Sequence, residues 1–346
     1  MRHRKAFAVV LGIMVFIKII SVLVYRHNNT APQFGNKFLR PIGVSNIVGR
    51  TSYKFCYRQD KCKTGKPFNM TQEFVRVMDQ LRRTTVDDDV TQMVFVTAAS
   101  ANHFTESLDS IGSIQKHFPG SLILYYDWGL WPLQRQEIQT WCNVQLMELD
   151  LREFTSADRS KYYVWKIMVI AHALLNYPRV FWVDSSIRIV TSRFGNIKNV
   201  IQSNGGFAMF DDTICDHSTL AVTHPEMFQY FVTDWQMQTK QFQYQGGAVI
   251  LTRTDFVVDE ILQWLLLCVM HPECIAPVPW SMCTFKRDRM ARYAKCHRHD
   301  QSAFNILASN AFKFKKYSAG GRQQFLIVKR KHAKDYKIKI CPNQKQ

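Results

Sequence analysis

The chain has 346 residues, of which 47% are hydrophobic, and this is enough to bury a full core in one large domain with appendages. Its 45 Lys and Arg outnumber its 27 Asp and Glu, and the net charge of +18 indicates an anionic partner. The sequence contains no internal repeat and no low-complexity tract, which excludes a repeat architecture.

The N-terminus carries a candidate membrane anchor. Residues 7–25 are almost continuously apolar and follow the basic run Arg2-His3-Arg4-Lys5, so the pattern predicts a single transmembrane helix behind a cytosolic tail of residues 1–6. Inserting the charge of Lys18 into the membrane costs about 2–3 kcal/mol if the residue lies at the centre of the span. Lys18 lies toward the lumenal half, so its aliphatic stem can carry the ammonium to the membrane surface. A cleaved signal peptide is the alternative, although no small-x-small site follows the run. We therefore expect a type II protein of the Golgi or ER membrane.

Other features agree with a lumenal address. Asn28-Asn29-Thr30 and Asn69-Met70-Thr71 are glycosylation acceptors, and all nine cysteines follow the candidate anchor. Cys56 and Cys62 are plausible disulfide partners, whereas the pairing among four later cysteines stays open; these are Cys268, Cys274, Cys283 and Cys296. In this compartment the anionic partner is a nucleotide sugar, an acidic glycan or a lipid headgroup, and nucleic acid is not expected.

The composition divides the lumenal part into three regions. Residues 26–90 are polar and basic and are expected to form a stem or entry region, with a short amphipathic helix over residues 71–83. Residues 91–320 are expected to form the catalytic domain. Residues 321–346 are interpreted as a basic C-terminal tail, since the chain from Lys313 onward holds eleven Lys or Arg and a single acid, Asp335.

Strand and helix patterns alternate from Met93 onward. The apolar runs predict strands over residues 93–98, 122–126, 144–149 and 179–183, and the intervening segments predict helices over 106–117, 134–141 and 161–175. This alternation is typical of an α/β fold with a mostly parallel sheet flanked by helices.

Later segments are less regular. A strand over residues 207–210 is expected to end at Asp211-Asp212, and Gly246-Gly247 enters an apolar strand over residues 248–251. Paired glycines there allow the backbone to approach a ligand closely. Residues 256–270 predict a buried helix, and the polar cluster at 296–301 leads into a final helix.

Asp184 is the candidate centre of a functional site. It follows the buried strand Arg179–Val183, and ligands of parallel α/β sheets bind beyond the carboxyl ends of the strands. The alternative is that Asp184 only starts a turn.

Three motifs carry a resemblance to a known family. Trp182-Val183-Asp184-Ser185-Ser186, Gln245-Gly246-Gly247-Ala248-Val249 and His299-Asp300-Gln301-Ser302-Ala303 occur in the order found in nucleotide-diphospho-sugar transferases of the GT-A (Rossmann-like) type. The region from Met93 to about Phe312 resembles an uncharacterised, nematode-abundant domain family placed in that superfamily. The resemblance implies transfer of a sugar from a nucleotide-diphosphate donor, most simply a UDP-sugar, to a glycan, glycoprotein or glycolipid acceptor.

The resemblance also implies a metal. In such enzymes an Asp-x-Asp motif holds Mn²⁺ or Mg²⁺ against the donor diphosphate, whereas Ser186 stands at the second acidic position here. We hypothesise that Asp184 and His299 form the metal site. His299 could instead be a hydrogen-bonded structural histidine, and a zinc site using Cys283, Cys296 and His297 lacks the usual spacing.

The same strand suggests a substitute for the missing acid. If the backbone stays extended, Asp184, Ser186 and Arg188 point to one face, and Arg188 could then reach the diphosphate. A tight turn at Ser185-Ser186 would break this arrangement.

Further candidates complete the predicted site. Asp300 and Gln301 resemble a pair that contacts the donor sugar, although Asp300 could simply cap a helix. Asp211, with Asp212 and Asp216 as alternatives, could be the general base of an inverting enzyme. Lys166 is a candidate for positioning the nucleotide, and Gly246 and Gly247 for backbone contact with the donor.

The sequence thus supports a glycosyltransferase as the leading hypothesis. Because the second acid is missing, a catalytically inactive glycan-binding or scaffold protein of the same fold is the alternative. A sulfotransferase is a weaker one, since the phosphate-binding loop that it needs is not visible.

Overall fold

The computed structural model describes most of the chain beyond its N-terminus. All described residues belong to one compact unit that runs from Phe38 to Gln346. They are residues 47–58, 61–83, 93–149, 164–193, 197–319, 325–331 and 334–341.

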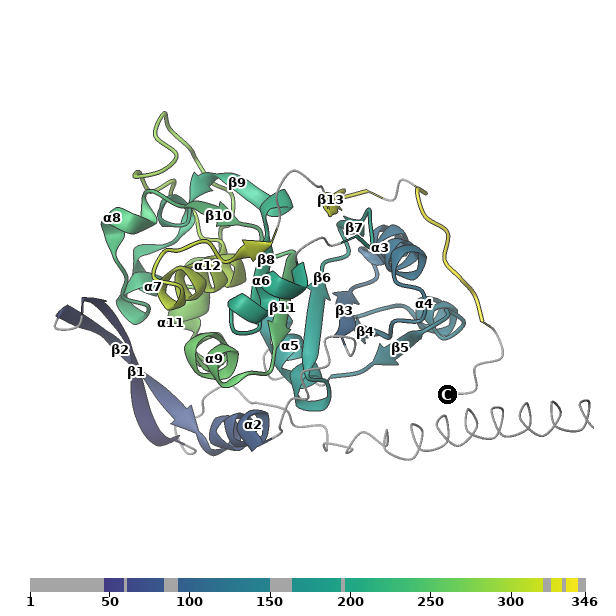
Figure 1. The fold of residues 1–346 in the computed structure, drawn as a ribbon, viewed down its shortest axis with the longest axis horizontal. Helices are drawn as coiled ribbons and strands as arrows, with labels where there is room; N and C mark the ends of the chain where they lie inside the picture. The colour runs from purple at the N-terminus through teal and green to yellow at the C-terminus, as the bar shows by residue number, and fades with distance from the viewer. Residues whose placement is uncertain are drawn as a thin grey trace, which may run out of the picture. The chain divides into compact units, whose positions relative to one another are not determined.

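A twisted sheet forms the centre of the unit (Figure 1). Among the described residues it has seven strands, in the order β12 (Ser318–Ala319), β8 (Phe207–Phe210), β11 (Ala248–Thr252), β6 (Arg179–Val183), β3 (Met93–Ala99), β4 (Ile123–Asp127) and β5 (Val144–Met147). Only β11 runs against its neighbours β6 and β8, while the other pairings are parallel. The predicted mostly parallel α/β fold is confirmed.

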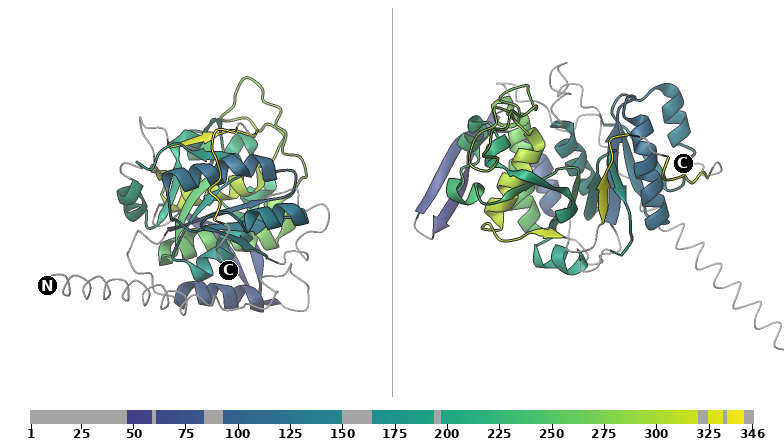
Figure 2. Two further views of the ribbon diagram at one scale, coloured as in Figure 1. Left: turned by 90° about the vertical axis from the view of Figure 1, so that its right-hand side faces the viewer. Right: turned by 90° about the horizontal axis from the view of Figure 1, so that it is seen from above.

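Helices cover both faces of the sheet (Figure 2). Strand β6 shows why, because its side chains alternate: Val180 and Trp182 enter one apolar core, and Phe181 and Val183 enter the other. The first core includes residues from α2 (Gln72–Arg83), α5 (Val164–Asn176), α10 (Gln263–Met270) and α12 (His299–Ala311). The second includes residues from α3 (Phe104–His117), α4 (Pro132–Ile138) and α6 (Ile197–Ser203).

The expected helix over residues 256–270 is a composite one. It begins as α9 (Asp255–Val257), passes through the π-helical turn η6 (Val258–Leu262) and continues as α10. Smaller elements complete the fold: β9 (Ile214–Ser218), β10 (Phe242–Tyr244), α7 (Pro225–Tyr230), α8 (Trp235–Gln238), α11 (Pro272–Ile275), η4 (Asp211–Thr213) and η5 (Leu220–Val222).

The entry region is more ordered than the sequence indicated. Strands β1 (Ile47–Arg58) and β2 (Lys61–Thr71) form an antiparallel hairpin, which the polar composition did not predict. Tyr53, Phe55 and Phe68 from this hairpin are buried in the first core. The hairpin and α2 therefore pack on the domain, because alternate residues of the hairpin are aromatic.

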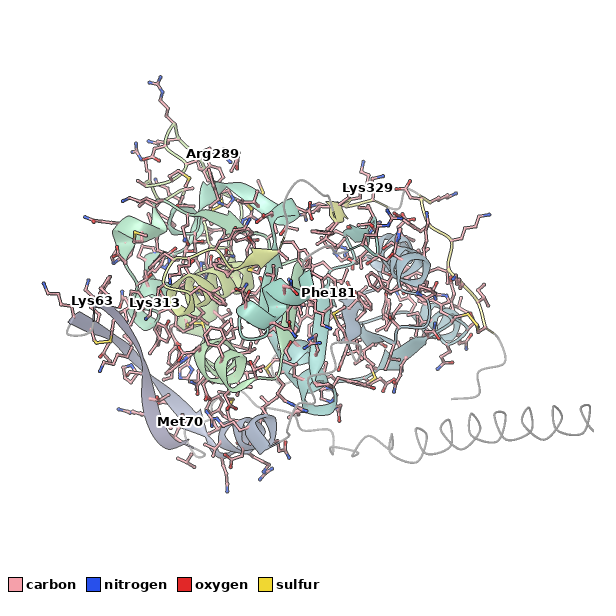
Figure 3. All side chains as sticks on the ribbon, viewed as in Figure 1. Lys63, Met70, Phe181, Arg289, Lys313 and Lys329 are labelled. Carbon is pink, nitrogen blue, oxygen red and sulfur yellow. A yellow bond between two sulfur atoms is a disulfide. The ribbon has the colours of Figure 1, made fainter. Side chains whose placement is uncertain are left out.

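The basic C-terminal segment, whose charge indicated a solvated face or a frayed end, also contacts the domain. Strand β13 (Leu326–Val328) pairs with β7 (Ile187–Ile189), and Ile340 forms a bridge with Trp141. Phe325 and Leu326 are buried, whereas Lys329, Arg330 and Lys331 are exposed. In Figure 3, Lys329 of this segment lies at the surface, as does Arg289, whereas Phe181 of the central sheet lies in the interior.

Four disulfides cross-link the described residues. The expected Cys56–Cys62 pair is confirmed, and the later cysteines pair as Cys268–Cys274 and Cys283–Cys296. The fourth, Cys142–Cys341, joins positions 199 residues apart, and Cys215 is free.

Removing the Cys142–Cys341 cross-link should have a large effect on stability. We expect the double variant C142A/C341A to lose about 2–5 kcal/mol of unfolding free energy, because the bond closes a long loop. Urea unfolding measures the loss, and Cys215→Ala, which removes a thiol but no disulfide, is the matched control. An equal stability of the double variant and the control would contradict this expectation.

The candidate membrane anchor at residues 7–25 lies outside the described residues, as does the acceptor at Asn28. In the part of the chain that is described, no helix combines the length and apolarity needed to cross a bilayer.

Candidate functional site

The order in which strands are added to the sheet reverses beside β3, and this place is called the switch point of the sheet. Strand β3 leads to β4 on one side, whereas β6 lies on the other side of β3, and all three strands are parallel. Ligands of open α/β sheets bind outside the carboxyl ends of the strands at such a point. Asp184 directly follows β6 and therefore stands at this position.

Lys166 lies at the centre of a buried charged cluster beside that strand end. It comes from the first turns of α5, and its Nζ is 3.2 Å from Asp184 Oδ1 and 2.8 Å from Asp300 Oδ2. The ammonium also donates to the carbonyl of Gly246 at 3.1 Å. One side chain thereby joins α5, the end of β6, the start of β11 and the start of α12.

Electrostatics keep this lysine charged. Burial lowers the pKa of Lys166, but the carboxylates of Asp184 and Asp300 outweigh burial and raise that pKa above its usual value. Burial also raises the pKa of Asp300, and Lys166 opposes this shift. The lysine and Asp300 side chains are only 4% and 6% exposed, whereas Asp184 is 30% exposed and presents the cluster to solvent.

Neighbouring groups fix the direction of the Asp184 carboxylate. The indole Nε1 of Trp182 donates to Asp184 Oδ1 at 2.7 Å, because residues two apart on a strand share a face. The Lys166 ammonium lies 5.5 Å from the centroid of the same indole ring. The backbone nitrogen of Asp184 donates to the Gly247 carbonyl at 2.8 Å, which holds the glycine pair against the strand end.

The glycine pair is close to the carboxylates. A Cβ at Gly247 would lie 3.1 Å from Asp184 Oδ2 and 3.3 Å from Ile187 Cδ1, so glycine is favoured there by lack of space. A Cβ at Gly246 would lie 3.5 Å from Asp300 Oδ2, an ordinary contact. Both glycines predicted to approach a ligand thus stand beside the charged cluster.

Gln301 extends the site along α12. Its Nε2 donates to Gln243 Oε1 at 2.7 Å and contacts the free thiol of Cys215 at 3.7 Å. Burial raises the pKa of Cys215 to about 11, so this sulfur is a thiol at neutral pH. Gln301 and Asp300 therefore lie side by side at the helix start, as the sequence motif indicated.

The structure places Ser186 and Arg188 differently from the prediction. The chain turns at Ser185-Ser186, where the Ile187 nitrogen donates to the Asp184 carbonyl, so the expected extended backbone is wrong. Arg188 consequently points into the protein: its Nη1 donates to the Ser185 carbonyl at 2.6 Å and its Nη2 lies 3.7 Å from Asp109 Oδ2. Arg188 is 1% exposed, which does not suit contact with a diphosphate.

His299 begins α12 with its ring in the interior. Its Nδ1 lies 3.2 Å from the Ile275 carbonyl, and the neighbouring His297 directs its Nε2 to the same oxygen at 3.1 Å. Burial lowers the pKa of His299 to about 4 and the pKa of His297 well below its usual value. Burial thus keeps both rings neutral while the shared Ile275 carbonyl opposes the shift, and this internal bonding is expected of the structural alternative.

The acidic candidates after β8 have separate partners. Asp211 accepts hydrogen bonds from the Ser318 hydroxyl and, at 2.7 Å, from Lys316 Nζ. Asp212 accepts from the Phe325 nitrogen at 3.0 Å. Asp216 is mostly exposed and pairs with Arg289 at 2.7 Å. Asp211 thus contacts residues in and beside β12, and Asp212 contacts the C-terminal segment; that one of these three acids is a base stays a prediction.

Sequence reasoning missed a second polar group at the switch point. Glu106, in the first turn of α3, lies 2.9 Å from His103 Nδ1 and accepts a bond of 3.4 Å from the Ser185 hydroxyl. His103 is half exposed. The sequence did contain a signal for Glu106: the polar loop after β3 leads into a helix at the same edge of the sheet as Asp184.

The donor set does not fit a divalent metal. A hard cation takes several oxygen ligands, but Asp184 Oδ1 already accepts from Trp182 and lies beside the Lys166 ammonium. The expected partner His299 turns its Nδ1 to a carbonyl. Within the described stretches, no three His, Cys, Asp or Glu side chains are grouped so that they could hold a metal.

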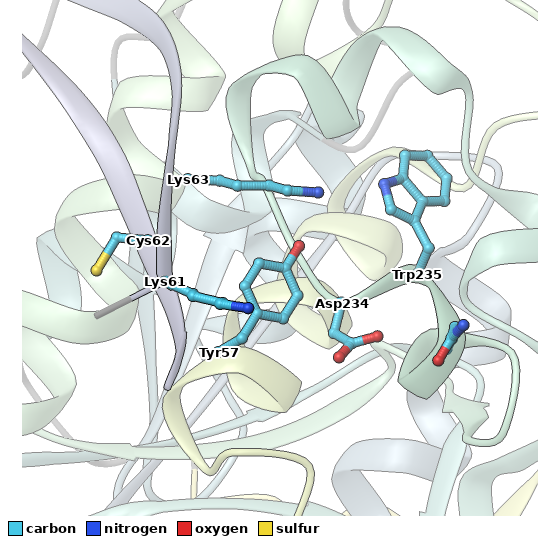
Figure 4. A pocket seen from close by; sticks show the side chains of 7 residues that line it. Tyr57, Lys61, Cys62, Lys63, Asp234 and Trp235 are labelled. Carbon is cyan, nitrogen blue, oxygen red and sulfur yellow. The ribbon is translucent and has the colours of Figure 1, made fainter. Parts of the chain in front are cut away.

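A groove elsewhere on the molecule shares no residue with this cluster. It measures about 530 Å³ and lies between the β1–β2 hairpin and α8 (Figure 4). Lys61 and Lys63 line it together with Tyr57, Asp234 and Trp235. Lys63 Nζ lies 5.2 Å from the centroid of the Tyr57 ring.

Comparison with solved structures finds glycosyltransferases. The bifunctional glycosyltransferase WbbM, in its apo form, is 16% identical over 55% of this chain and 38% of its own. Galactosyltransferase LgtC, in complex with donor and acceptor sugar analogues, is 13% identical over 66% of this chain and 73% of its own. GlyE of Streptococcus pneumoniae is 13% identical over 66% of this chain and 46% of its own. Each TM-score is 0.34, and similarity at this level does not assign a function.

The chain thus spans well under two thirds of the length of WbbM and of GlyE. No curated protein matches it. Residues 44–171 match a family described as "Protein of unknown function (DUF1647)". This match includes the β1–β2 hairpin and the Lys166 region, and it relates less than half of the chain to that family.

Proposed function

We propose that the chain is a glycosyltransferase of the GT-A type that transfers a sugar from a nucleoside diphosphate to a glycan, glycoprotein or glycolipid. The observation that carries the proposal is the contact of Lys166 with both Asp184 and Asp300 at the switch point of the sheet. A buried ion pair network is costly to desolvate, and such networks concentrate at functional sites.

Each residue of the cluster has a distinct role in this proposal. The exposed edge of Asp184 accepts hydrogen bonds from hydroxyl groups of the donor. Asp300 and Gln301 face the transferred sugar from the start of α12, and Gly246 and Gly247 let the donor approach the backbone. Lys166 holds the two carboxylates in place and balances part of their charge.

The transfer itself breaks the bond between the anomeric carbon and the diphosphate oxygen. A bond from the acceptor oxygen to that carbon forms, the acceptor hydroxyl passes its proton to the departing diphosphate oxygen, and the nucleoside diphosphate leaves. The anchor predicted at residues 7–25 would place this reaction at the Golgi or ER membrane.

The decisive experiment is a panel of nucleotide sugars given to the purified full chain, with donor hydrolysis and transfer as readouts. We expect Asp300→Asn to lower kcat at least about 100-fold, as loss of a positioned polar group in a site does. Asp259→Asn makes the same chemical change in a half-exposed carboxylate that pairs with Arg82, and it should leave kcat unchanged. No turnover and no binding of any nucleotide sugar would contradict the proposal and favour a glycan-binding or scaffold role.

The glycine pair offers a second test. Gly247→Ala should weaken UDP binding about tenfold, equivalent to ~1.4 kcal/mol, because the added methyl displaces the Asp184 carboxylate or Ile187. Gly246→Ala adds the same methyl at an ordinary contact distance and should bind UDP nearly as the wild type. Calorimetric titration distinguishes the two variants, and equal affinities would exclude this role for Gly247.

A further inference from the structure

Lys166 stands where a cation bound by the carboxylates would have to stand. Its Nζ has three oxygen atoms within 3.2 Å: Asp184 Oδ1, Asp300 Oδ2 and the Gly246 carbonyl. Ligation by several oxygens, two of them from carboxylates, is also what Mg²⁺ or Mn²⁺ prefers. The side chain is 4% exposed and belongs to a helix that is buried in the first core, so it cannot swing away easily.

A metal entering this space would meet a positive charge. The two carboxylates and the ammonium together carry one net negative charge, and a divalent ion would have to displace or approach the ammonium. Two like charges about 4 Å apart repel each other by several kcal/mol at the effective dielectric of a protein site. The cation position is thus filled by the chain itself.

A diphosphate nevertheless needs positive charge, and the C-terminal segment supplies it nearby. The β13–β7 pairing sets Val328 opposite Ile187, and the Lys329 nitrogen then donates to the Ser186 carbonyl at 2.7 Å. Ser186 is two residues from Asp184. Lys329, Arg330 and Lys331 are all exposed at this edge, and Lys329 Nζ pairs with Asp335 at 2.6 Å.

We propose that this site binds its nucleoside diphosphate without a divalent metal, with Lys166 in the cation position between Asp184 and Asp300 and with Lys329 and Arg330 neutralising the diphosphate. This inference rests on the proposed function and adds the source of positive charge to it. Arg330 can bind a phosphate with two parallel hydrogen bonds, whereas Lys329 acts as a point charge and exchanges Asp335 for the ligand.

The first test is UDP binding by the full chain in EDTA and in Mn²⁺. The proposal predicts equal affinities within about twofold in the two solutions. Binding that appears only with Mn²⁺ overturns the metal-free site while leaving the glycosyltransferase proposal intact. No UDP binding in either solution contradicts the proposed function itself, so the two failures are distinguishable.

The second test compares two double variants of equal charge. K329A/R330A removes two cations beside Ser186, and K61A/K63A removes two exposed lysines from the remote groove. We expect the first to weaken UDP binding at least tenfold in EDTA and the second to change it less than twofold. An equal loss in both variants would show a general effect of net charge and overturn the role of the C-terminal segment.

The third test measures metal binding directly and needs no activity assay. Titration with Mn²⁺, followed by its paramagnetic resonance signal, should show no tight site in the wild type. Lys166→Ala frees the two carboxylates and should create a site, reported also by quenching of Trp182, whose indole bonds to Asp184. A tight Mn²⁺ site in the wild type that needs Asp184 overturns the inference. The wild-type measurements decide the question even if Lys166→Ala does not fold.

Discussion

Lys166→Met is expected to destabilise the folded chain by about 3–5 kcal/mol, because it leaves the Asp300 carboxylate buried without its counter-charge. Methionine keeps the length and the apolar stem of lysine, so the loss of the ammonium is the main change. Urea unfolding at neutral pH measures the effect. The double variant K166M/D300N, which removes both charges of the buried pair, should recover a large part of the lost stability.

The pH dependence of Lys166→Met gives a further check with a definite sign. Burial raises the pKa of Asp300, and without Lys166 only the backbone N–H of Gln301 opposes the shift. A carboxyl whose pKa is higher in the folded than in the unfolded chain binds more protons when folded, so stability falls as the pH rises above the usual Asp range. The variant should therefore be closer to the wild type at pH 5 than at pH 7.5. A loss below 0.5 kcal/mol at both pH values would contradict the buried ion pair.

Acid should unfold the wild-type chain through its buried histidines. Burial lowers the pKa of His299 to about 4, whereas an unfolded histidine titrates near 6.5. The unfolded chain therefore takes up protons first as the pH falls from about 6.5 toward 4, and the stability that the neutral ring contributes is lost over this range. The shift corresponds to roughly 3 kcal/mol for this residue.

Unfolding free energies measured between pH 7 and pH 4.5 test this expectation. His299→Gln keeps a polar side chain that can donate to the Ile275 carbonyl and should flatten the pH dependence. The same slope in the variant and in the wild type would exclude His299 as a source of acid sensitivity.

Much of the fold could be predicted because the apolar pattern of each strand is local. The runs ending at Ala98, Tyr126 and Val183 are buried on both faces, as parallel strands are, and the structure places them side by side. The order of the glycine and Asp-Gln motifs also predicted which segments meet at the sheet edge. Lys166, Asp184, Gly246 and Asp300 do lie together.

Other features depend on contacts between distant segments, which one sequence does not reveal. The β1–β2 hairpin is polar on its exposed face and buries aromatic residues only against the domain. For the basic C-terminal segment, the sequence alone does not indicate which residues face the domain, because the pairing of β13 with β7 decides this. At the turn Ser185-Ser186 the Ser186 carbonyl accepts from the Lys329 nitrogen of the distant C-terminal segment, and the Arg188 side chain after the turn lies beside Asp109 of α3.

Calorimetric titration of the full chain with UDP shows whether the cluster of Lys166, Asp184 and Asp300 takes part in binding a nucleoside diphosphate. We expect saturable binding by the wild type and by Asp259→Asn, whose half-exposed carboxylate pairs with Arg82. Asp184→Asn, whose exposed carboxylate edge is altered, should bind UDP at least about tenfold more weakly. Equal UDP affinity of Asp184→Asn and the wild type, or no binding by either, would contradict this role of the cluster.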